Sequence, residues 1–234
     1  MAAPSEAGDP APRRELHWRD SCRLIPSRFP PVALFETVAD PADLDVVFAI
    51  EALGNPRLRD AVGQLQLVPP AQRISGPGTS PIMAAFTHLN PEGSRFSDGS
   101  FGVYYAAADL ATAVAEVSHH RARFLARTAE PPIDIDLRCY RVGVRARLAD
   151  LRGLAGVLHD PDSYAASQPY GRRLREQGEA GIVYDSVRHP GGQCVALFTP
   201  RATLPPASQA EHVGLRWDGT RICAWYLKSG LQAL

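Results

Sequence analysis

The chain has 234 residues and no formal net charge, with 25 Lys+Arg against 25 Asp+Glu. Hydrophobic residues make up 45% and charged residues 21%, which excludes a wholly disordered chain, a collagen and a coiled coil. The best apolar stretch, residues 46–50, is far shorter than the roughly 18 to 20 residues of a membrane helix. A neutral chain also lacks the basic excess typical of nucleic-acid binders, so we expect function to lie in a local site.

Arginine supplies nearly all of the positive charge, because Lys228 is the only lysine. Codon bias towards GC-rich codons is sufficient to explain this composition. The chemical consequence is the same in either case. Any anion that this protein binds is held by planar guanidinium groups, which suit phosphate and carboxylate.

The cysteines and the N-terminus indicate the cellular compartment. The four cysteines are far apart and include no CxxC pair, so zinc-site spacing is absent. Three of them, Cys22 excepted, lie in strand-like runs where buried thiols are usual. Residues 1–12 lack the positive start and apolar core of a secretory signal. We therefore expect a cytoplasmic protein with reduced thiols.

The N-terminal third is expected to be helical. Residues 1–14 are rich in Pro, Ala and Gly and are predicted to be a disordered tail. Residues 15–70 are predicted to form an N-terminal helical lobe. Its first helix should span residues 41–52, with Asp40 as the N-cap, and a second should span residues 58–67.

Residues 71–234 are expected to form the main core of the protein, because short strands and few helices follow one another there. This pattern predicts an α+β fold with a mixed sheet. Helices are predicted near residues 168–177 and over residues 109–127, where apolar residues recur at i, i+3, i+4 and i+7 after the N-cap Asp109. Strands are predicted at residues 72–75, 82–88, 101–106, 133–139, 140–148, 181–187, 194–199 and 221–227.

The common catalytic signatures are missing from the sequence. It contains no GxxxxGK[ST] loop, no GxSxG elbow and no HExxH helix. The adjacent pair His119-His120 would diverge by about 100° on a helix and could not ligate one metal together. We therefore expect no metal site.

Two segments carry groups suited to chemistry. In the first, Arg95 lies in a polar loop, an aromatic strand follows, and Glu116 stands at the edge of the apolar stripe of the next helix. Glu116 can face a cleft between helix and sheet or remain a solvated helix acid. In the second, Ser186 ends an apolar strand before a Gly-Gly turn, a place where serine ordinarily serves the turn itself.

Together these segments resemble the RES domain, the toxin half of RES–Xre toxin–antitoxin pairs. The resemblance covers about residues 29–226. It rests on Arg73, Arg95-Phe96-Ser97, Gly102-Val103-Tyr104-Tyr105-Ala106, Ala115-Glu116, Tyr184-Asp185-Ser186-Val187-Arg188 and Cys194-Val195-Ala196-Leu197-Phe198. Many family members have Gly-Arg-Trp where this chain has Ser94-Arg95-Phe96, a change that keeps an aromatic side chain.

The resemblance implies a bacterial cytoplasmic toxin with an ADP-ribosyltransferase-like fold and NAD as co-substrate. The implied activity is cleavage of the nicotinamide–ribose bond and transfer of ADP-ribose to a target protein. The alternative is an NAD glycohydrolase or phosphorylase that depletes NAD without a protein acceptor, and a third reading is a catalytically inactive binding module. The implied partner is a small DNA-binding Xre-type antitoxin that covers the active cleft, with a toxin homodimer inside that complex. Neither direct nucleic-acid binding nor membrane binding is expected.

The resemblance also points to the groups that would act on NAD. Cleavage passes through an oxocarbenium-like transition state, which a carboxylate near the ribose stabilises. The expected catalytic residues are Glu116, Arg95 and Ser186.

The expected NAD-binding residues surround this catalytic set. Arg73 and Arg95 are predicted to bind the pyrophosphate, and Tyr105 is predicted to stack on the nicotinamide. His88 and Ser186 complete the predicted NAD-binding set. Because side chains alternate along a strand, Tyr105 in the cleft places Tyr104 on the opposite face.

Overall fold

A computed structural model of the protein describes residues 11–27, 34–36, 40–48, 62–154 and 156–229. Its strands form one curved mixed sheet in the order β1-β2-β5-β4-β3-β6-β7, and β1 also pairs with β3. They are β1 (Arg13–Pro26), β2 (Tyr104–Ala107), β3 (Ile133–Asp150), β4 (Gly181–Asp185), β5 (Gln193–Leu197), β6 (Thr203–Trp217) and β7 (Ile222–Leu227). Only β3 and β4 pair in parallel. The α+β class predicted from the sequence is therefore confirmed.

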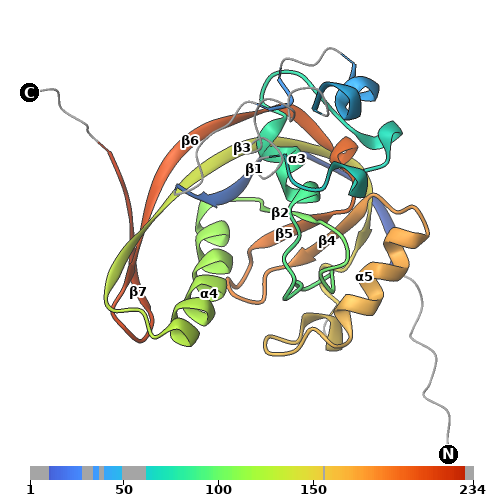
Figure 1. Ribbon diagram of the computed structural model, residues 1–234. Coiled ribbons are helices and arrows are strands. Elements are labelled where there is room, and N and C mark those ends of the chain that lie inside the picture. Colours follow the sequence, from blue (N-terminus) through green and yellow to red (C-terminus); the bar gives the residue numbers. More distant parts are fainter. Residues whose placement is uncertain (1–10, 28–33, 37–39, 49–61, 155, 230–234) are drawn as a thin grey trace, which may run out of the picture.

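The sheet separates two hydrophobic cores. One core packs α4 (Leu110–Thr128) and α5 (Ser167–Glu176) against the sheet. The other packs α3 (Ser80–Thr87) and the described N-terminal segments against the opposite face. Figure 1 shows α4 beneath the arch formed by β1, β3 and β6, whereas α3 overlaps the top of that arch in this view. None of the described helices combines the length and apolar character needed to cross a membrane.

The helix α4 forms where the sequence predicted it. The Asp109 side chain accepts the Thr112 N–H at 2.8 Å, which satisfies one of the free donors of the first turn. The helix ends at Ala129, whose φ of 51° is left-handed, and two prolines follow shortly after it. The predicted helix near residues 168–177 is confirmed as α5.

Several predicted strands are confirmed within a few residues. The predictions for residues 181–187, 194–199 and 221–227 correspond to β4, β5 and β7. The predictions for residues 133–139 and 140–148 describe one continuous strand, β3. The strand predicted at residues 101–106 is shorter and begins later, as β2. The long strand β6 was not predicted.

The strand predicted at residues 82–88 is wrong, because this segment is the helix α3. Six of its eight residues are buried: Ser80, Ile82, Met83, Ala85, Phe86 and Thr87. A helix buried on nearly all sides has no polar face, so its short apolar run reads like a buried strand. The strand predicted at residues 72–75 is also wrong, since the 3₁₀ turn η3 (Pro70–Gln72) leads into an isolated extended residue, Arg73.

The N-terminal prediction requires a larger correction. Residues 13–26, assigned to the tail and the helical lobe, form β1 and pair with β3 from Arg13↔Ala149 to Pro26↔Leu137. An irregularity between Trp18 and Ser21 interrupts the alternation that would have indicated a strand. Residues 1–10 of the predicted tail lie outside the described residues.

Part of the predicted helical lobe is described. Asp40 caps the 3₁₀ turn η1 (Pro41–Asp43) by accepting the Ala42 N–H, and residues 44–48 continue as α-helix. The rest of that helix, and residues 58–61 of the second one, lie outside the described residues. The described end of the second helix is the 3₁₀ turn η2 (Leu65–Leu67).

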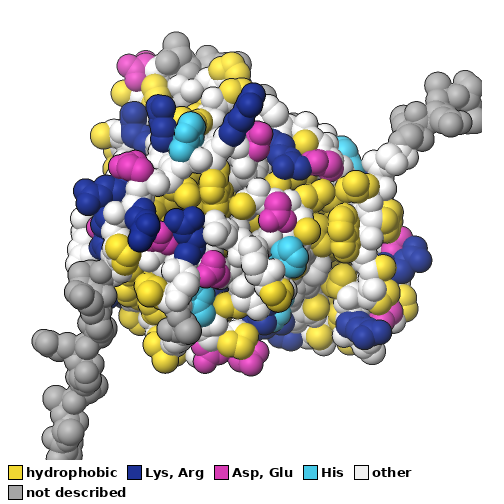
Figure 2. Space-filling view, turned by 180° about the vertical axis from the view of Figure 1, so that it is seen from behind, with side chains coloured by type: hydrophobic (Ala, Val, Ile, Leu, Met, Phe, Trp, Pro, Cys, Tyr) yellow, Lys and Arg dark blue, Asp and Glu magenta, His cyan; other side chains and the backbone are white. Residues whose placement is uncertain are grey.

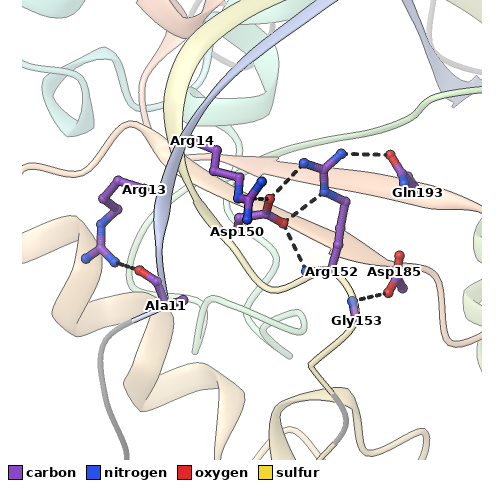
Figure 3. A network of polar contacts seen from close by, with 8 residues as sticks. All are labelled: Ala11, Arg13, Arg14, Asp150, Arg152, Gly153, Asp185 and Gln193. Carbon is purple, nitrogen blue, oxygen red and sulfur yellow. Dashed lines mark hydrogen bonds and ion pairs between the residues drawn. The ribbon is translucent and has the colours of Figure 1, made fainter.

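A buried carboxylate joins the start of β1 to the end of β3, as Figure 3 shows. Asp150 is 5% exposed and is bound by Arg152 at 2.7 Å and by Arg14 at 3.4 Å. Arg152 also donates to Gln193 of β5 at 3.2 Å. The hydrogen bond from Arg152 holds the pKa of Asp150 below its usual range. This network links the start of β1 and the end of β3 to the first residue of β5.

Candidate active site

A pocket opens between α4 and the sheet on the side of the first core. Strands β1, β2, β4 and β5, the loop at residues 94–95 and the helix α4 all contribute to its lining. The volume of its cavity is about 140 Å³, which is smaller than the roughly 300 to 1,000 Å³ of typical small-molecule and cofactor sites. Of the residues predicted to act on NAD, Arg95, Tyr105 and Glu116 line this pocket.

Glu116 and Ser186 meet at the pocket wall although 70 residues separate them in the sequence. Ser186 Oγ donates to Glu116 Oε1 at 2.6 Å. The same Oγ accepts the backbone N–H groups of Arg188 at 3.1 Å and His189 at 3.0 Å. Because both lone-pair directions of the hydroxyl are used, its single hydrogen is directed at the carboxylate. One oxygen of Glu116 is therefore held by Ser186.

Tyr105 reaches the pocket from β2. Its hydroxyl accepts the Phe96 N–H at 3.0 Å and hydrogen-bonds Ser94 Oγ at 2.9 Å. Burial raises the pKa of Tyr105 to about 12, so the hydroxyl keeps its proton at neutral pH. Tyr104 points to the opposite face, where it is fully buried and stacks on Phe86 with ring centroids 6.5 Å apart. The alternation expected for this strand is therefore observed.

Arg95 lines the pocket from the loop that precedes β2. It is 5% exposed, and its Nη1 donates to the carbonyl oxygens of Leu158 at 3.2 Å and Asp160 at 2.9 Å. Its guanidinium lies 4.9 Å from the ring centroid of Tyr164. These contacts hold the positive charge of Arg95 at the pocket wall.

The structure does not bring Arg73 to the pocket, although it was predicted to bind NAD. Arg73 is 3% exposed and lies with the second core, where Nε donates to the Val68 carbonyl at 2.9 Å and Nη1 pairs with Asp45 at 2.7 Å. Its guanidinium thus holds the N-terminal segments together. The sequence could not reveal this, because the carbonyl acceptors are defined only by the folded backbone.

His88 is also outside the pocket. It is the exposed C-terminal cap of α3, and its Nδ1 lies 3.2 Å from the Ala84 carbonyl and 3.1 Å from Thr87 Oγ1. Its assignment to the NAD site depended on a strand at residues 82–88 that would have delivered it to the cleft. Because that segment is a helix on the other face of the sheet, the imidazole is directed elsewhere.

Two residues that the sequence analysis did not assign to the site line the pocket. Arg23 arrives on β1, donates to the Tyr105 carbonyl at 2.9 Å and lies 4.9 Å from the ring centroid of Tyr104. Its buried Nε has no hydrogen-bond partner among the described residues. Burial lowers the pKa of Arg23. Cys22 and Leu24 line the pocket as well, so alternation along the strand would not have singled out Arg23.

His120 lines the pocket one helical turn after Glu116. His120 is exposed to solvent, and its pKa is lowered from the ordinary value by desolvation and by the nearby His119 and Arg188. It shares the wall with the Glu116 carboxylate and the arginine side chains of the pocket. Across the described ranges, the structure shows no group of three or more His, Cys, Asp or Glu side chains that could hold a metal ion.

The fold and the pocket define an α+β protein whose site pairs a helix carboxylate with a strand-end serine, beside arginine side chains and a tyrosine. Comparison with known proteins agrees with this description: the model of the RES domain matches residues 70–218, which is more than half of the chain. The protein belongs to the RES domain family. The strand β1, which supplies Arg23, precedes the matched region.

Two similar proteins illustrate the range of this relationship. The uncharacterized protein y4oC of Sinorhizobium fredii is 34% identical over 209 residues, covering 87% of this chain and 85% of that protein. The crystal structure of the M. tuberculosis MbcT–MbcA toxin–antitoxin complex contains a chain that is 19% identical, with a TM-score of 0.40, covering 62% of this chain and 79% of that one.

Proposed function

We propose that this protein is an NAD-consuming toxin that cleaves the bond between nicotinamide and ribose. The observation that carries the proposal is the 2.6 Å hydrogen bond from Ser186 to Glu116 at the wall of the pocket, within a RES domain. Nicotinamide leaves as a neutral molecule, so the reaction needs little help from an acid. It needs stabilisation of the positive charge that develops on the ribose.

Glu116 is suited to that task. With one carboxylate oxygen occupied by Ser186, the other is available to the ribose ring or to a ribose hydroxyl. A preorganised negative charge in a partly dry site stabilises an oxocarbenium-like transition state more than it stabilises the bound ground state of NAD. Ser186 keeps the carboxylate in place as the charge develops.

The positive side chains of the pocket suit the two phosphates of NAD. Arg95 is held at the wall by two carbonyl oxygens, and Arg23 also contributes to the lining. Guanidinium groups bind phosphate through paired N–H donors. Tyr105 lines the same pocket and offers the nicotinamide an aromatic surface.

The acceptor that we propose is a side chain of a target protein, which makes the protein an ADP-ribosyltransferase. The second candidate is transfer to water or inorganic phosphate. Phosphate is favoured by the arginines near His120: after desolvation and His119, the charges of Arg188, Arg123 and Arg95 also lower the pKa of this histidine.

The partner that we propose is a small DNA-binding antitoxin of the Xre type that covers the pocket, with a toxin homodimer within that complex. Membership of the RES domain family supports this proposal.

The test uses NAD labelled in its adenylate half, incubated with the purified protein and with a cell lysate depleted of small molecules. Release of nicotinamide supports the proposed bond cleavage. Label on a protein band supports transfer, free ADP-ribose supports hydrolysis, and ADP-ribose 1-phosphate formed only with added phosphate supports phosphorolysis. Absence of nicotinamide release under all of these conditions would contradict the proposal.

A further inference from the structure

The loop that joins β4 to β5 is bound to the first turn of α4 through a buried threonine. Thr112 is fully buried, and its hydroxyl donates to Asp109 Oδ2 at 2.7 Å. The same oxygen lies 2.8 Å from His189 Nδ1. Since the single hydroxyl hydrogen goes to Asp109, His189 must be the donor in the second contact.

The Asp109 carboxylate accepts hydrogen bonds and donates none. Burial acts to raise its pKa, but the backbone N–H and the hydroxyl of Thr112 outweigh burial, so the pKa lies below its usual range. An ionised Asp109 accepts from both groups of Thr112 at once. The direction of the chain of hydrogen bonds is therefore set from His189 through Thr112 to Asp109.

The same residue extends this chain to the proposed catalytic pair through its backbone. The backbone N–H of His189 donates to Ser186 Oγ at 3.0 Å, and Ser186 Oγ donates to Glu116 Oε1 at 2.6 Å. The series of contacts thus begins at Asp109 and ends at Glu116, both on the α4 segment. It closes a ring between two elements that are more than 70 residues apart in the sequence.

The backbone of the loop is adapted to this contact. The Ser186 N–H donates to the Gly192 carbonyl at 2.8 Å, and the Gly192 N–H donates to the His189 carbonyl at 2.9 Å. A Cβ on Gly192 would lie 2.4 Å from Thr112 Oγ1 and 3.0 Å from His189 Nδ1. Glycine is required here for close approach to Thr112.

We propose that Thr112 and His189 are positioning residues for the cleavage reaction. They fix the position and direction of the Ser186 hydroxyl. Ser186 then holds one carboxylate oxygen of Glu116, and the other oxygen remains available to the substrate. This inference rests on the proposed function, because Glu116 is the group that they position.

The first experiment compares Thr112→Val, which keeps the shape and removes the hydroxyl, with Thr112→Ser, which keeps the hydroxyl. Thr128→Val, at the exposed end of the same helix, is the control. Because small misplacements of a catalytic group are costly, kcat for nicotinamide release should fall about 10- to 100-fold in Thr112→Val. KM for NAD should change less than about twofold, and Thr112→Ser should retain most of the activity. A folded Thr112→Val with wild-type kcat would overturn the inference.

A second pair of variants covers the case in which Thr112→Val does not fold. His189 is only half-buried, and His189→Asn keeps a donor nitrogen near the position of Nδ1, whereas His189→Leu removes it. We expect His189→Leu to lose kcat and His189→Asn to keep most of it. Equal activity in both variants would overturn the role of His189.

Amide hydrogen exchange at residue 189 gives a readout that does not depend on NAD. The His189 amide should exchange faster in Thr112→Val than in wild type, because its acceptor Ser186 is no longer held, and unchanged exchange would overturn the contact itself. Wild-type protein that releases no nicotinamide would overturn the proposed function and with it the catalytic role of this ring. The exchange result then decides the structural contact alone.

Discussion

Ser186 Oγ donates a 2.6 Å hydrogen bond to Glu116 Oε1, so the end of β4 is tied to the middle of α4. The two residues are the serine and the glutamate of the RES resemblance, and only Glu116 lines the pocket. Ser186 is 9% exposed and lies behind the carboxylate. In the function that we propose, Glu116 makes the contact with the developing positive charge of the ribose, and Ser186 holds the Glu116 carboxylate.

Replacement of Glu116 by glutamine is expected to lower nicotinamide release about 10²- to 10³-fold, as for the loss of one preorganised electrostatic group. The amide oxygen can still accept from Ser186, so the melting temperature should change little. Steady-state release assays and thermal unfolding check both expectations. Glu176→Gln, at an exposed position of α5, is the matched control. A folded Glu116→Gln protein with wild-type turnover would refute the assignment.

Arg95 and Arg73 are expected to respond oppositely to replacement by lysine. Arg95→Lys should weaken NAD binding about tenfold, because Arg95 lines the pocket and lysine would replace its paired N–H donors by a point charge. Arg73→Lys should leave NAD affinity unchanged and lower the free energy of unfolding by about 1–3 kcal/mol, since buried carbonyl oxygens lose their donors. Calorimetry with NAD and urea unfolding measure the two effects. Loss of NAD affinity in Arg73→Lys alone would reverse our assignment.

Substitution of Tyr104 is expected to affect mainly stability, and substitution of Tyr105 mainly NAD turnover. Tyr104→Ala should lower the free energy of unfolding by about 3–5 kcal/mol, because it opens a cavity beside Phe86. Tyr105→Ala should remove most NAD turnover with a smaller change in stability. Tyr105→Phe keeps the ring but leaves the Phe96 N–H without its acceptor, so it should raise amide exchange at residue 96. Abolished turnover in a folded Tyr104→Ala and normal turnover in Tyr105→Ala would contradict this division.

The environment of His119 predicts a dependence of stability on pH. Burial and the nearby Arg188 lower the pKa of His119 to about 4 in the folded protein, below the ordinary value of 6.5. Between these values the unfolded chain binds more protons than the folded one, so the free energy of unfolding should fall as pH decreases from about 6.5 to 4. Urea unfolding across this range measures the decrease. It should be smaller in His119→Gln than in wild type or in the control His212→Gln, and an equal decrease in all three would contradict the prediction.

The sequence did not predict which faces of the strands are exposed to solvent. Figure 2 shows basic and acidic side chains interspersed on one face, with hydrophobic side chains gathered towards the side that β7 occupies. Trp225 and Leu227 of β7 are 46% and 49% exposed. The sequence analysis assigned residues 221–227 to a strand correctly, but alternation alone does not tell whether either face of a strand is covered.

Local signals were sufficient for much of the fold. The cap Asp109 and the periodic apolar stripe predicted α4, and the order of the arginine, glutamate and serine segments indicated the RES family. Helix capping and amphipathic periodicity depend on residues within a few positions of each other, so they can be read directly from the chain. These signals placed Glu116, Arg95 and Tyr105 in segments that do line one pocket.

Only the tertiary structure decided which arginines reach that pocket. Arg23 lies there because β1 pairs with β3, more than 100 residues later in the sequence, whereas Arg73 is held by carbonyl oxygens on the other side of the sheet. The helix α3 was likewise hidden, since burial on nearly all sides removes the polar face that marks a helix. Strand partners and buried hydrogen-bond acceptors are created by long-range contacts, and no local pattern of residues encodes them.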